Sequence, residues 1–176
     1  MSKDVEPSLI IERTYKADVA ELWDLWTTKD GFESWWGPDQ FRADVITIEP
    51  RQGGALHYTM VADTPEAIAA MERMGAPTSQ VCRGMFREFK PNDRLVLTQV
   101  IDFLPGVAPY DSTIAVDFLA MAAGTARMVV TLSPMHDRPT TIMQKEGFTS
   151  QLAKLDSRWR ATVPVSRSGP LRDVEP

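Results

Sequence analysis

The sequence contains one cysteine, Cys82, which excludes an internal disulfide and any metal cluster held by several cysteines. It has only two histidines, His57 and His136, which lie far apart and lack the spacing of a zinc site. The Gly53-Gly54 pair belongs to no Gly-x-Gly motif, so a dinucleotide site is unsupported. We therefore expect neither a metal nor a cofactor.

Long hydrophobic runs and clusters of positive charge are also missing. No apolar run approaches the roughly 18 residues needed to cross a bilayer, and residues 1–7 lack the apolar core of a signal peptide. Lysines and arginines are scattered along a chain of net charge −5, so no basic stripe indicates nucleic-acid binding. These absences predict a cytoplasmic protein that neither inserts into a membrane nor binds nucleic acid.

What is present is an ordinary globular composition. The 176 residues suit one domain with a sizeable core, and 43% hydrophobic and 24% charged residues are typical of such a domain. We expect the domain to span residues 8–162. The polar arm 1–7 and the proline-containing tail 163–176 are predicted to be flexible.

Periodicity predicts most of the regular structure. Alternating residues bounded by turn signals predict strands at 8–15, 41–49, 55–62, 80–89, 94–103, 112–120 and 125–133. Apolar residues at helical spacing predict two short helices after the first strand, near 19–26 and 29–36. Asp18, with Glu21 three residues later, resembles a capping box at the start of the first helix.

Residues 63–78 interrupt the strand pattern. Pro65 begins a run of good helix formers that Gly75 ends, so we predict a short helix inserted between two strands. Ile68, Met71 and Met74 would lie on its apolar side.

A long helix from Thr140 to about Ala161 follows the last strand. Phe148, Leu152, Leu155 and Trp159 form an apolar stripe along it. Short connections imply a mostly antiparallel sheet, and its apolar face needs a cover. The predicted fold is therefore α+β: a curved antiparallel sheet wrapped around the C-terminal helix, with the two short helices closing one end.

Several segments together resemble the bacterial relatives of the activator of heat-shock-protein-90 ATPase, within the START-like superfamily. They are Ala17 to Thr27, which ends in Trp-Thr, Trp35-Trp36-Gly37-Pro38, Arg51-Gln52-Gly53-Gly54, and Gly147-Phe148 to Leu155. Gln52 stands where the family has proline, and Phe148 where it has tryptophan. The segments 65–75, 102–107 and 135–137 resemble a subset of the family. The resemblance covers about residues 8–160.

This resemblance implies a helix-grip fold of the START and Bet v kind, with a cavity between the sheet and the long helix. Members of the superfamily bind lipids, hormones and polyketides, and a few catalyse cyclisation or hydrolysis. Likeness of fold is a weak guide to activity, so the residues must decide between several functions.

The first hypothesis is binding of a small hydrophobic molecule in this cavity, because apolar pockets with a few polar groups are the usual sites of such folds. Methionines suit irregular ligands, and the insert 63–78 would act as a lid. The predicted ligand-binding residues are Tyr58, Met60, Met71, Met74, Arg83, Phe86, Phe103, Tyr110 and Met143.

The second hypothesis is a cyclase- or hydrolase-type enzyme acting on a polyketide-like or aromatic substrate. It requires a polar cluster inside the cavity, and the candidates are His136, Asp137, Tyr110 and Arg83. Asp137 or Thr140 can instead cap the last helix, and strand parity leaves the direction of Arg83 open. No catalytic residue is assigned.

The third hypothesis is a chaperone-interaction domain, by analogy with the activator. The eukaryotic activator carries an additional N-terminal domain, whereas only a seven-residue arm precedes the domain predicted here, which argues against a chaperone partner. A homodimer stays open.

Three other features have structural explanations that we favour. Trp35-Trp36-Gly37-Pro38 could line a ligand mouth, but tryptophan mostly supplies packing area, so we expect it to anchor the short helices. His57 alternates with Leu56 and Tyr58 and should face solvent. Cys82, in the middle of a strand, is expected to be a small buried hydrophobe.

Overall fold

The computed structural model describes residues 7–159, which form seven strands and four helices. The strands are β1 (Leu9–Tyr15), β2 (Phe41–Ile48), β3 (Ala55–Ala62), β4 (Ser79–Lys90), β5 (Arg94–Ile101), β6 (Tyr110–Ala120) and β7 (Ala126–Leu132). The helices are α1 (Val19–Thr27), α2 (Lys29–Glu33), α3 (Pro65–Arg73) and α4 (Arg138–Trp159). The predicted tails, apart from residue 7, lie outside the described residues.

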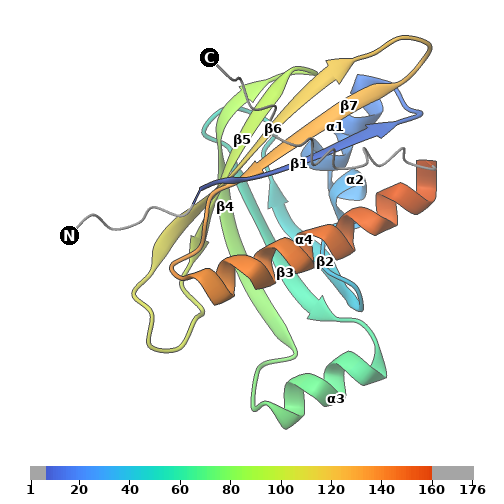
Figure 1. The fold of residues 1–176 in the computed structure, drawn as a ribbon. Helices are drawn as coiled ribbons and strands as arrows, with labels where there is room; N and C mark the ends of the chain where they lie inside the picture. Colours follow the sequence, from blue (N-terminus) through green and yellow to red (C-terminus); the bar gives the residue numbers. More distant parts are fainter. Residues whose placement is uncertain (1–6, 160–176) are drawn as a thin grey trace, which may run out of the picture.

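All seven strands belong to one antiparallel sheet in the order β1-β7-β6-β5-β4-β3-β2. Consecutive strands from β2 to β7 are neighbours, whereas β1 pairs with β7 at the far edge from β2. Figure 1 shows α4 crossing one face of the curved sheet and α3 projecting beyond the ends of β3 and β4. The predicted α+β helix-grip architecture is confirmed.

An aromatic cluster holds α1 and α2 against the sheet. Trp26 and Trp35 are fully buried, with ring centroids 5.0 Å apart, and Trp36 stacks on Phe32 at 4.6 Å. The Trp35 indole N–H donates to the Leu25 carbonyl at 3.0 Å. The Trp35-Trp36 motif thus anchors the short helices, as predicted.

Helix α4 covers the sheet with the predicted stripe: Phe148, Leu152 and Leu155 are buried in the core. The helix begins at Arg138, two residues before the predicted start. The reason is a cap, because the Thr140 backbone N–H donates to Asp137 Oδ1 at 2.8 Å. At the other helix end, Asp156 accepts from the Tyr15 hydroxyl at 2.9 Å.

Two strand ends, those of β5 and β6, differ from the prediction by two residues, and the other ends differ by one residue at most. Strand β5 stops at Ile101, whose antiparallel partner Tyr110 begins β6. Residues 102–109 therefore form a loop with a turn at Pro105 and Gly106, where Gly106 adopts a positive φ of 73°. Phe103, predicted to be the last residue of β5, lies in this loop and is 40% exposed.

The direction of the β4 side chains, left open by the sequence, is settled by burial. Gly84 and Phe86 are buried, Cys82 is half-buried, and Arg83 and Met85 are exposed. Even positions from 82 to 86 therefore face the concave side of the sheet, and odd positions face outward. A bulge between Phe86 and Glu88 then shifts the register with β5.

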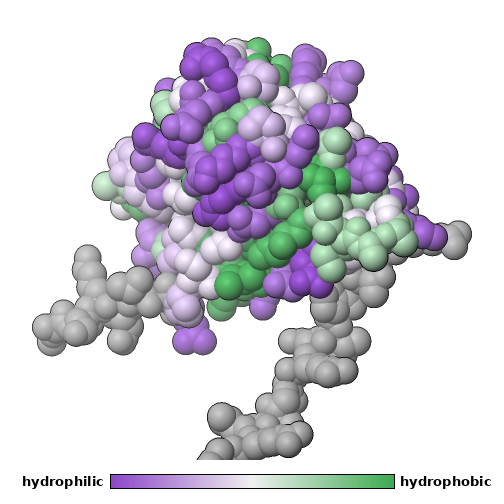
Figure 2. All heavy atoms as spheres, turned by 90° about the horizontal axis from the view of Figure 1, so that it is seen from above, coloured by the Kyte–Doolittle hydropathy of each residue, from purple (hydrophilic) through white to green (hydrophobic). Residues whose placement is uncertain are grey.

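Figure 2 shows the molecule from above, the end opposite α3 in Figure 1. Most of this face is hydrophilic, with one larger apolar area and several smaller apolar spots. Within residues 7–159, no helix combines the length and apolar character that a membrane span requires.

Candidate functional site

An apolar pocket of about 510 Å³ lies between strands β2 to β5 and residues 63–78, which contain α3 and are called the α3 segment. This volume is within the ~300–1,000 Å³ range of small-molecule sites. The pocket is partly open to solvent, and within the described chain no charged side chain lines it. Its lining residues are Phe41, Tyr58, Met60, Met71, Met74, Gly75, Ala76, Pro77, Thr78, Ser79, Gln80, Cys82, Gln99, Val100, Ile101, Phe103 and Pro105.

The floor of the pocket is built by alternation along neighbouring strands. Tyr58 and Met60 come from β3, Cys82 from β4, and Gln99 and Ile101 from β5. The register pairs Tyr58 with Cys82 directly across the sheet. Side chains two residues apart on a strand share a face, so these residues form one concave surface.

Helix α3 and the chain that follows it form the opposite wall. Met71 and Met74 line the pocket from this side, and residues 75–80 continue the wall. Gly75 has a φ of 64°, a conformation that glycine adopts without strain, so the helix ends there and the chain returns to β4. Met74 is 70% exposed, so the mouth of the pocket has an apolar rim.

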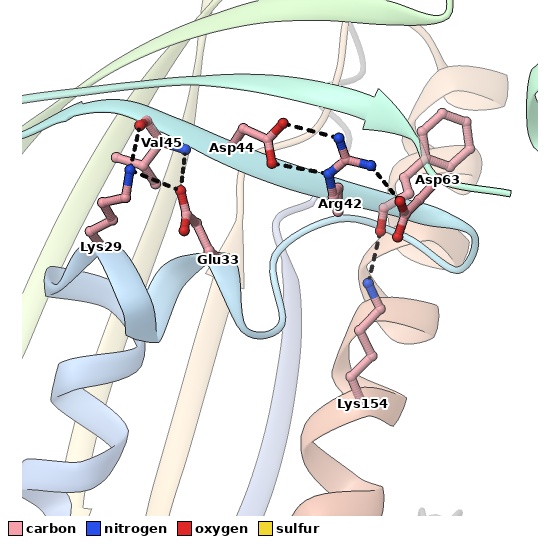
Figure 3. A network of polar contacts seen from close by, with 8 residues as sticks. Lys29, Glu33, Arg42, Asp44, Val45, Asp63 and Lys154 are labelled. Atoms are coloured by element: carbon pink, nitrogen blue, oxygen red, sulfur yellow. Dashed lines mark hydrogen bonds and ion pairs between the residues drawn. The ribbon is translucent and has the colours of Figure 1, made fainter.

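The N-terminal end of α3 is anchored beside β2. The Asp63 backbone N–H donates to the Gln40 carbonyl at 2.8 Å. The Thr64 hydroxyl donates to Gln40 Oε1 at 3.0 Å and accepts from the Ala67 N–H at 3.1 Å, which caps the helix. Figure 3 shows Arg42 bridging Asp63 and Asp44 at the same place. These contacts fix one end of the α3 wall.

Lys154 connects α4 to the chain that enters β2. Its Nζ donates to the carbonyl oxygens of Gly37 at 2.8 Å and Phe41 at 3.0 Å, and Figure 3 shows the Lys154 side chain pointing from α4 toward Asp63 and Arg42. Burial lowers the pKa of Lys154, and Asp39 and Asp63 act in the opposite direction.

None of the described α4 residues lines the pocket. The predicted cavity between sheet and long helix is therefore a cavity between sheet and α3 segment.

The Tyr58 hydroxyl is the central polar group of the floor. Tyr58 is 3% exposed and accepts from Gln99 Nε2 at 2.7 Å. Burial is the main cause that raises the pKa of Tyr58 well above its usual value, and burial also raises the pKa of the Cys82 thiol. Both groups stay protonated at neutral pH, and a thiol is a far weaker nucleophile than a thiolate. The floor therefore offers neutral hydrogen-bonding groups.

Five of the nine predicted ligand-binding residues line this pocket: Tyr58, Met60, Met71, Met74 and Phe103. The other four do not. Phe86 faces the concave side but is fully buried in the core. Met143 is 67% exposed on α4.

Arg83 lies on the outer face of the sheet, because Cys82 and Gly84 take the inward positions of β4. It pairs with Asp102 and borders a separate groove of about 250 Å³, which His57 also lines. His57 is thus on the outer face, as predicted, and Arg83 does not line the apolar pocket.

Tyr110 belongs to a polar cluster at the start of α4. Its hydroxyl lies 3.0 Å from His136 Nδ1, and His136 Nε2 lies 3.4 Å from Asp137 Oδ2. The hydrogen bonds from Thr140 to Asp137 lower the pKa of this carboxyl. Three of the four candidate residues, Tyr110, His136 and Asp137, therefore meet here, but none of them lines the pocket. Within residues 7–159, no three His, Cys, Asp or Glu side chains are grouped to hold a metal ion.

Several pocket residues were missed by sequence reasoning, among them Phe41, Cys82, Gln99 and residues 75–80. Gln99 has a readable signal, because it alternates with Leu97 and Ile101 and so places an amide on the apolar face. Cys82, predicted to be buried, is half-buried in the lining. Residues 75–80 carry no signal, because their position depends on the path of α3.

A curved antiparallel sheet that grips a C-terminal helix, with an apolar pocket on its concave side, defines a helix-grip protein. Residues 16–159 match the model of the family described as Activator of Hsp90 ATPase homolog 1-like protein, and the chain belongs to this family. Among curated proteins, no sequence matches this chain.

Solved structures show the same fold at low sequence identity. A protein from Chromobacterium violaceum is 17% identical with a TM-score of 0.66, over 87% of this chain and 96% of that one. A protein from Nitrosomonas europaea is 21% identical with a TM-score of 0.64, over 88% and 94%. An AHSA1 protein from Silicibacter pomeroyi is 19% identical with a TM-score of 0.66, over 86% and 96%. These similarities establish the fold alone.

Proposed function

We propose that this protein binds a small, uncharged hydrophobic molecule in the pocket between β2–β5 and the α3 segment. The observation that supports this is the lining: methionine, aromatic and aliphatic side chains predominate, and the polar residues, among them the hydrogen-bonded pair Tyr58 and Gln99, are all uncharged. An ion would lose its hydration here without meeting an opposite charge from the described lining. An apolar molecule would gain about 25 cal/mol for each Å² of apolar surface removed from water.

The methionines make this lining adaptable. Met60 projects from β3, whereas Met71 and Met74 belong to the α3 segment on the other side. Methionine has a flexible, unbranched side chain that fills irregular gaps. The pocket should therefore accept molecules of different outline, and its polar groups should decide how they are oriented.

Helix α3 acts as the lid in this proposal. Its N-terminal end is fixed by Asp63 and Thr64, and its C-terminal end turns at Gly75, where an added Cβ would meet nothing within 4 Å in the described chain. The chain rejoins the sheet only at Thr78, whose carbonyl accepts from the Ala62 N–H at 2.9 Å, so the part around Gly75 has room to shift and admit a ligand.

A cyclase or hydrolase acting on a polyketide-like or aromatic substrate is the second candidate. The contact of Tyr110 with His136, beside Asp137, favours it as an acid–base pair. Because these side chains do not line the pocket, the substrate would have to bind at the start of α4. We therefore rank it below ligand binding.

The same proposal extends to partners and location. The partner is a small hydrophobic molecule, and the protein works in the cytoplasm without nucleic acid, membrane insertion or a chaperone. A homodimer is compatible with it, since the pocket is built from one chain.

Cys82 provides the test, because it is the only cysteine and belongs to the pocket lining. The rate at which N-ethylmaleimide modifies Cys82 should fall when an uncharged aromatic or aliphatic compound fills the pocket. The thermal unfolding midpoint should rise with the same compounds, since they bind the folded state.

A double variant, Val81→Cys with Cys82→Ser, moves the only thiol to the outer face of β4, where Val81 is 50% exposed. Compounds that protect Cys82 should leave this thiol unprotected. If a broad panel of uncharged compounds changes neither the Cys82 rate nor the unfolding midpoint, the proposed function is wrong.

A further inference from the structure

Gln151, on α4, has a buried side-chain amide in which one atom forms no hydrogen bond within the described chain. Gln151 is 4% exposed, and its Oε1 accepts the Gly37 backbone N–H at 3.3 Å. Its Nε2 is buried and has no hydrogen-bond partner within the described chain. The Gly37 N–H requires an acceptor, so the amide orientation is determined and the unused atom is a donor. A buried donor of this kind needs an acceptor from elsewhere.

Gly37 connects this amide to the pocket. An added Cβ at Gly37, whose φ is 112°, would lie 3.2 Å from Met60 Sδ. Met60 also lines the pocket. The Met60 side chain therefore lies both in the pocket lining and beside Gly37, whose N–H donates to Gln151.

The Met60 side chain can rotate away from this position. It has three rotatable bonds in its side chain and is half-buried rather than locked in the core. Lys154 donates to both the Gly37 carbonyl and the Phe41 carbonyl. The backbone between these residues should therefore stay in place when the Met60 side chain rotates. Rotation of one methionine would extend the pocket toward Gln151.

We propose that Gln151 Nε2 donates a hydrogen bond to the bound ligand once Met60 has turned aside. This inference rests on the proposed binding function and specifies the ligand further: an apolar molecule that carries an uncharged acceptor, such as a ketone or ester carbonyl. An uncharged acceptor fits because the Lys154 ammonium, which also lies beside Gly37, already donates to two backbone carbonyls.

A matched pair of probes tests this directly. 2-Acetylnaphthalene carries a ketone, whereas 2-ethylnaphthalene has nearly the same shape without an acceptor. By isothermal titration, the wild-type protein should bind the ketone about three- to tenfold more tightly, the usual worth of one hydrogen bond. Gln151→Met should abolish this difference while it retains the affinity for 2-ethylnaphthalene.

Gln144 supplies the matched control. It lies two turns earlier on α4 and also has a buried amide atom, Oε1, without a partner among residues 7–159. Gln144 does not contact Gly37 through any hydrogen bond of the described chain, so Gln144→Met should preserve the preference for the ketone. If Gln151→Met does not fold, the Gln151 side-chain amide signal in ¹⁵N NMR replaces it: the signal should move downfield with the ketone and not with 2-ethylnaphthalene.

The outcomes separate the two proposals. If the wild-type protein binds both probes equally, and the Gln151 amide signal moves equally with both, the pocket is real but the role of Gln151 is wrong. If it binds neither probe, the proposed binding function fails for uncharged aromatic molecules, and the role of Gln151 fails with it.

Discussion

The Tyr58 hydroxyl accepts a hydrogen bond from Gln99 Nε2 over 2.7 Å, which joins β3 to β5 across the intervening strand β4. The pair is neutral and lies on the pocket floor. An apolar floor with one uncharged polar pair favours molecules that are largely hydrophobic but not ionised. Gln99 also constrains the Tyr58 ring, which packs on Phe32 at 5.2 Å, so the pocket is tied to the aromatic core.

Removal of this hydroxyl should have two effects. Tyr58→Phe leaves the Gln99 amide without its acceptor, so the free energy of unfolding in urea should fall by about 1 kcal/mol. Binding of an uncharged probe that carries an acceptor or hydroxyl should weaken as well. Tyr110→Phe removes a hydroxyl outside the pocket lining and should leave probe affinity unchanged. Equal probe affinities for wild type and Tyr58→Phe would refute a polar role of this residue.

The sequence predicted the fold more completely than the site, for a physical reason. Strand alternation and helical periodicity are local, so they predict the elements and even place Tyr58 and Met60 on the core face. The pocket depends on the path of α3 between β3 and β4, which few local contacts determine. Phe103 illustrates this: it was predicted to end a strand, but β5 ends at Ile101, and the residue reaches the pocket from the following loop.

Arg83 and Tyr110 illustrate why polar site residues were harder to predict. A one-residue shift in a strand moves every side chain to the other face, and the mixed residues of β4 gave no clear apolar face. Tyr110 begins β6 two residues earlier than predicted, which brings it to His136 instead of the pocket.

Alkylation of Cys82 should depend on pH in a predictable direction. Only the thiolate reacts with iodoacetamide, and burial raises the pKa of the Cys82 thiol above its usual value of about 8.5. At pH 8 the folded protein should therefore react more slowly than the urea-unfolded chain, and its rate should continue to rise at pH values where the unfolded chain has levelled off. Identical pH profiles in both states would contradict this environment for Cys82.

The edge of the sheet at β2 is protected by α2. The Val45 N–H donates to Glu33 Oε1 at 2.7 Å and the Val45 carbonyl accepts from Lys29 Nζ at 3.4 Å, as Figure 3 shows. Glu33→Ala should expose an unpaired N–H on an edge strand, lower the free energy of unfolding by about 1 kcal/mol and increase self-association in sedimentation velocity.

Lys29→Ala is the control for this prediction, because the Lys29 side chain is 60% exposed and its bond to Val45 is longer. It should cost less stability than Glu33→Ala. An equal loss in both variants would mean that their shared ion pair, and not the Val45 N–H, is what matters.

The aromatic cluster should dominate the stability of the domain. Trp26 is fully buried and packs on Trp35, Trp36 and Phe148. Trp26→Ala should lower the free energy of unfolding by about 3–5 kcal/mol, since it opens a large cavity in the core. Met143→Ala, at a 67% exposed position, should change it by less than about 0.5 kcal/mol. Comparable losses in chemical denaturation would contradict this division between core and surface.

The central claim is that uncharged apolar molecules bind between the sheet floor and α3, and NMR of ¹³C-methyl-labelled methionine tests it most directly. Addition of 2-acetylnaphthalene should shift the methyl signals of Met60, Met71 and Met74, which line the pocket. The signals of Met128, fully buried in the core, and of Met143, exposed on α4, should stay in place. Shifts confined to Met128 or Met143, or no shift at all up to the solubility limit of the probe, would contradict the account.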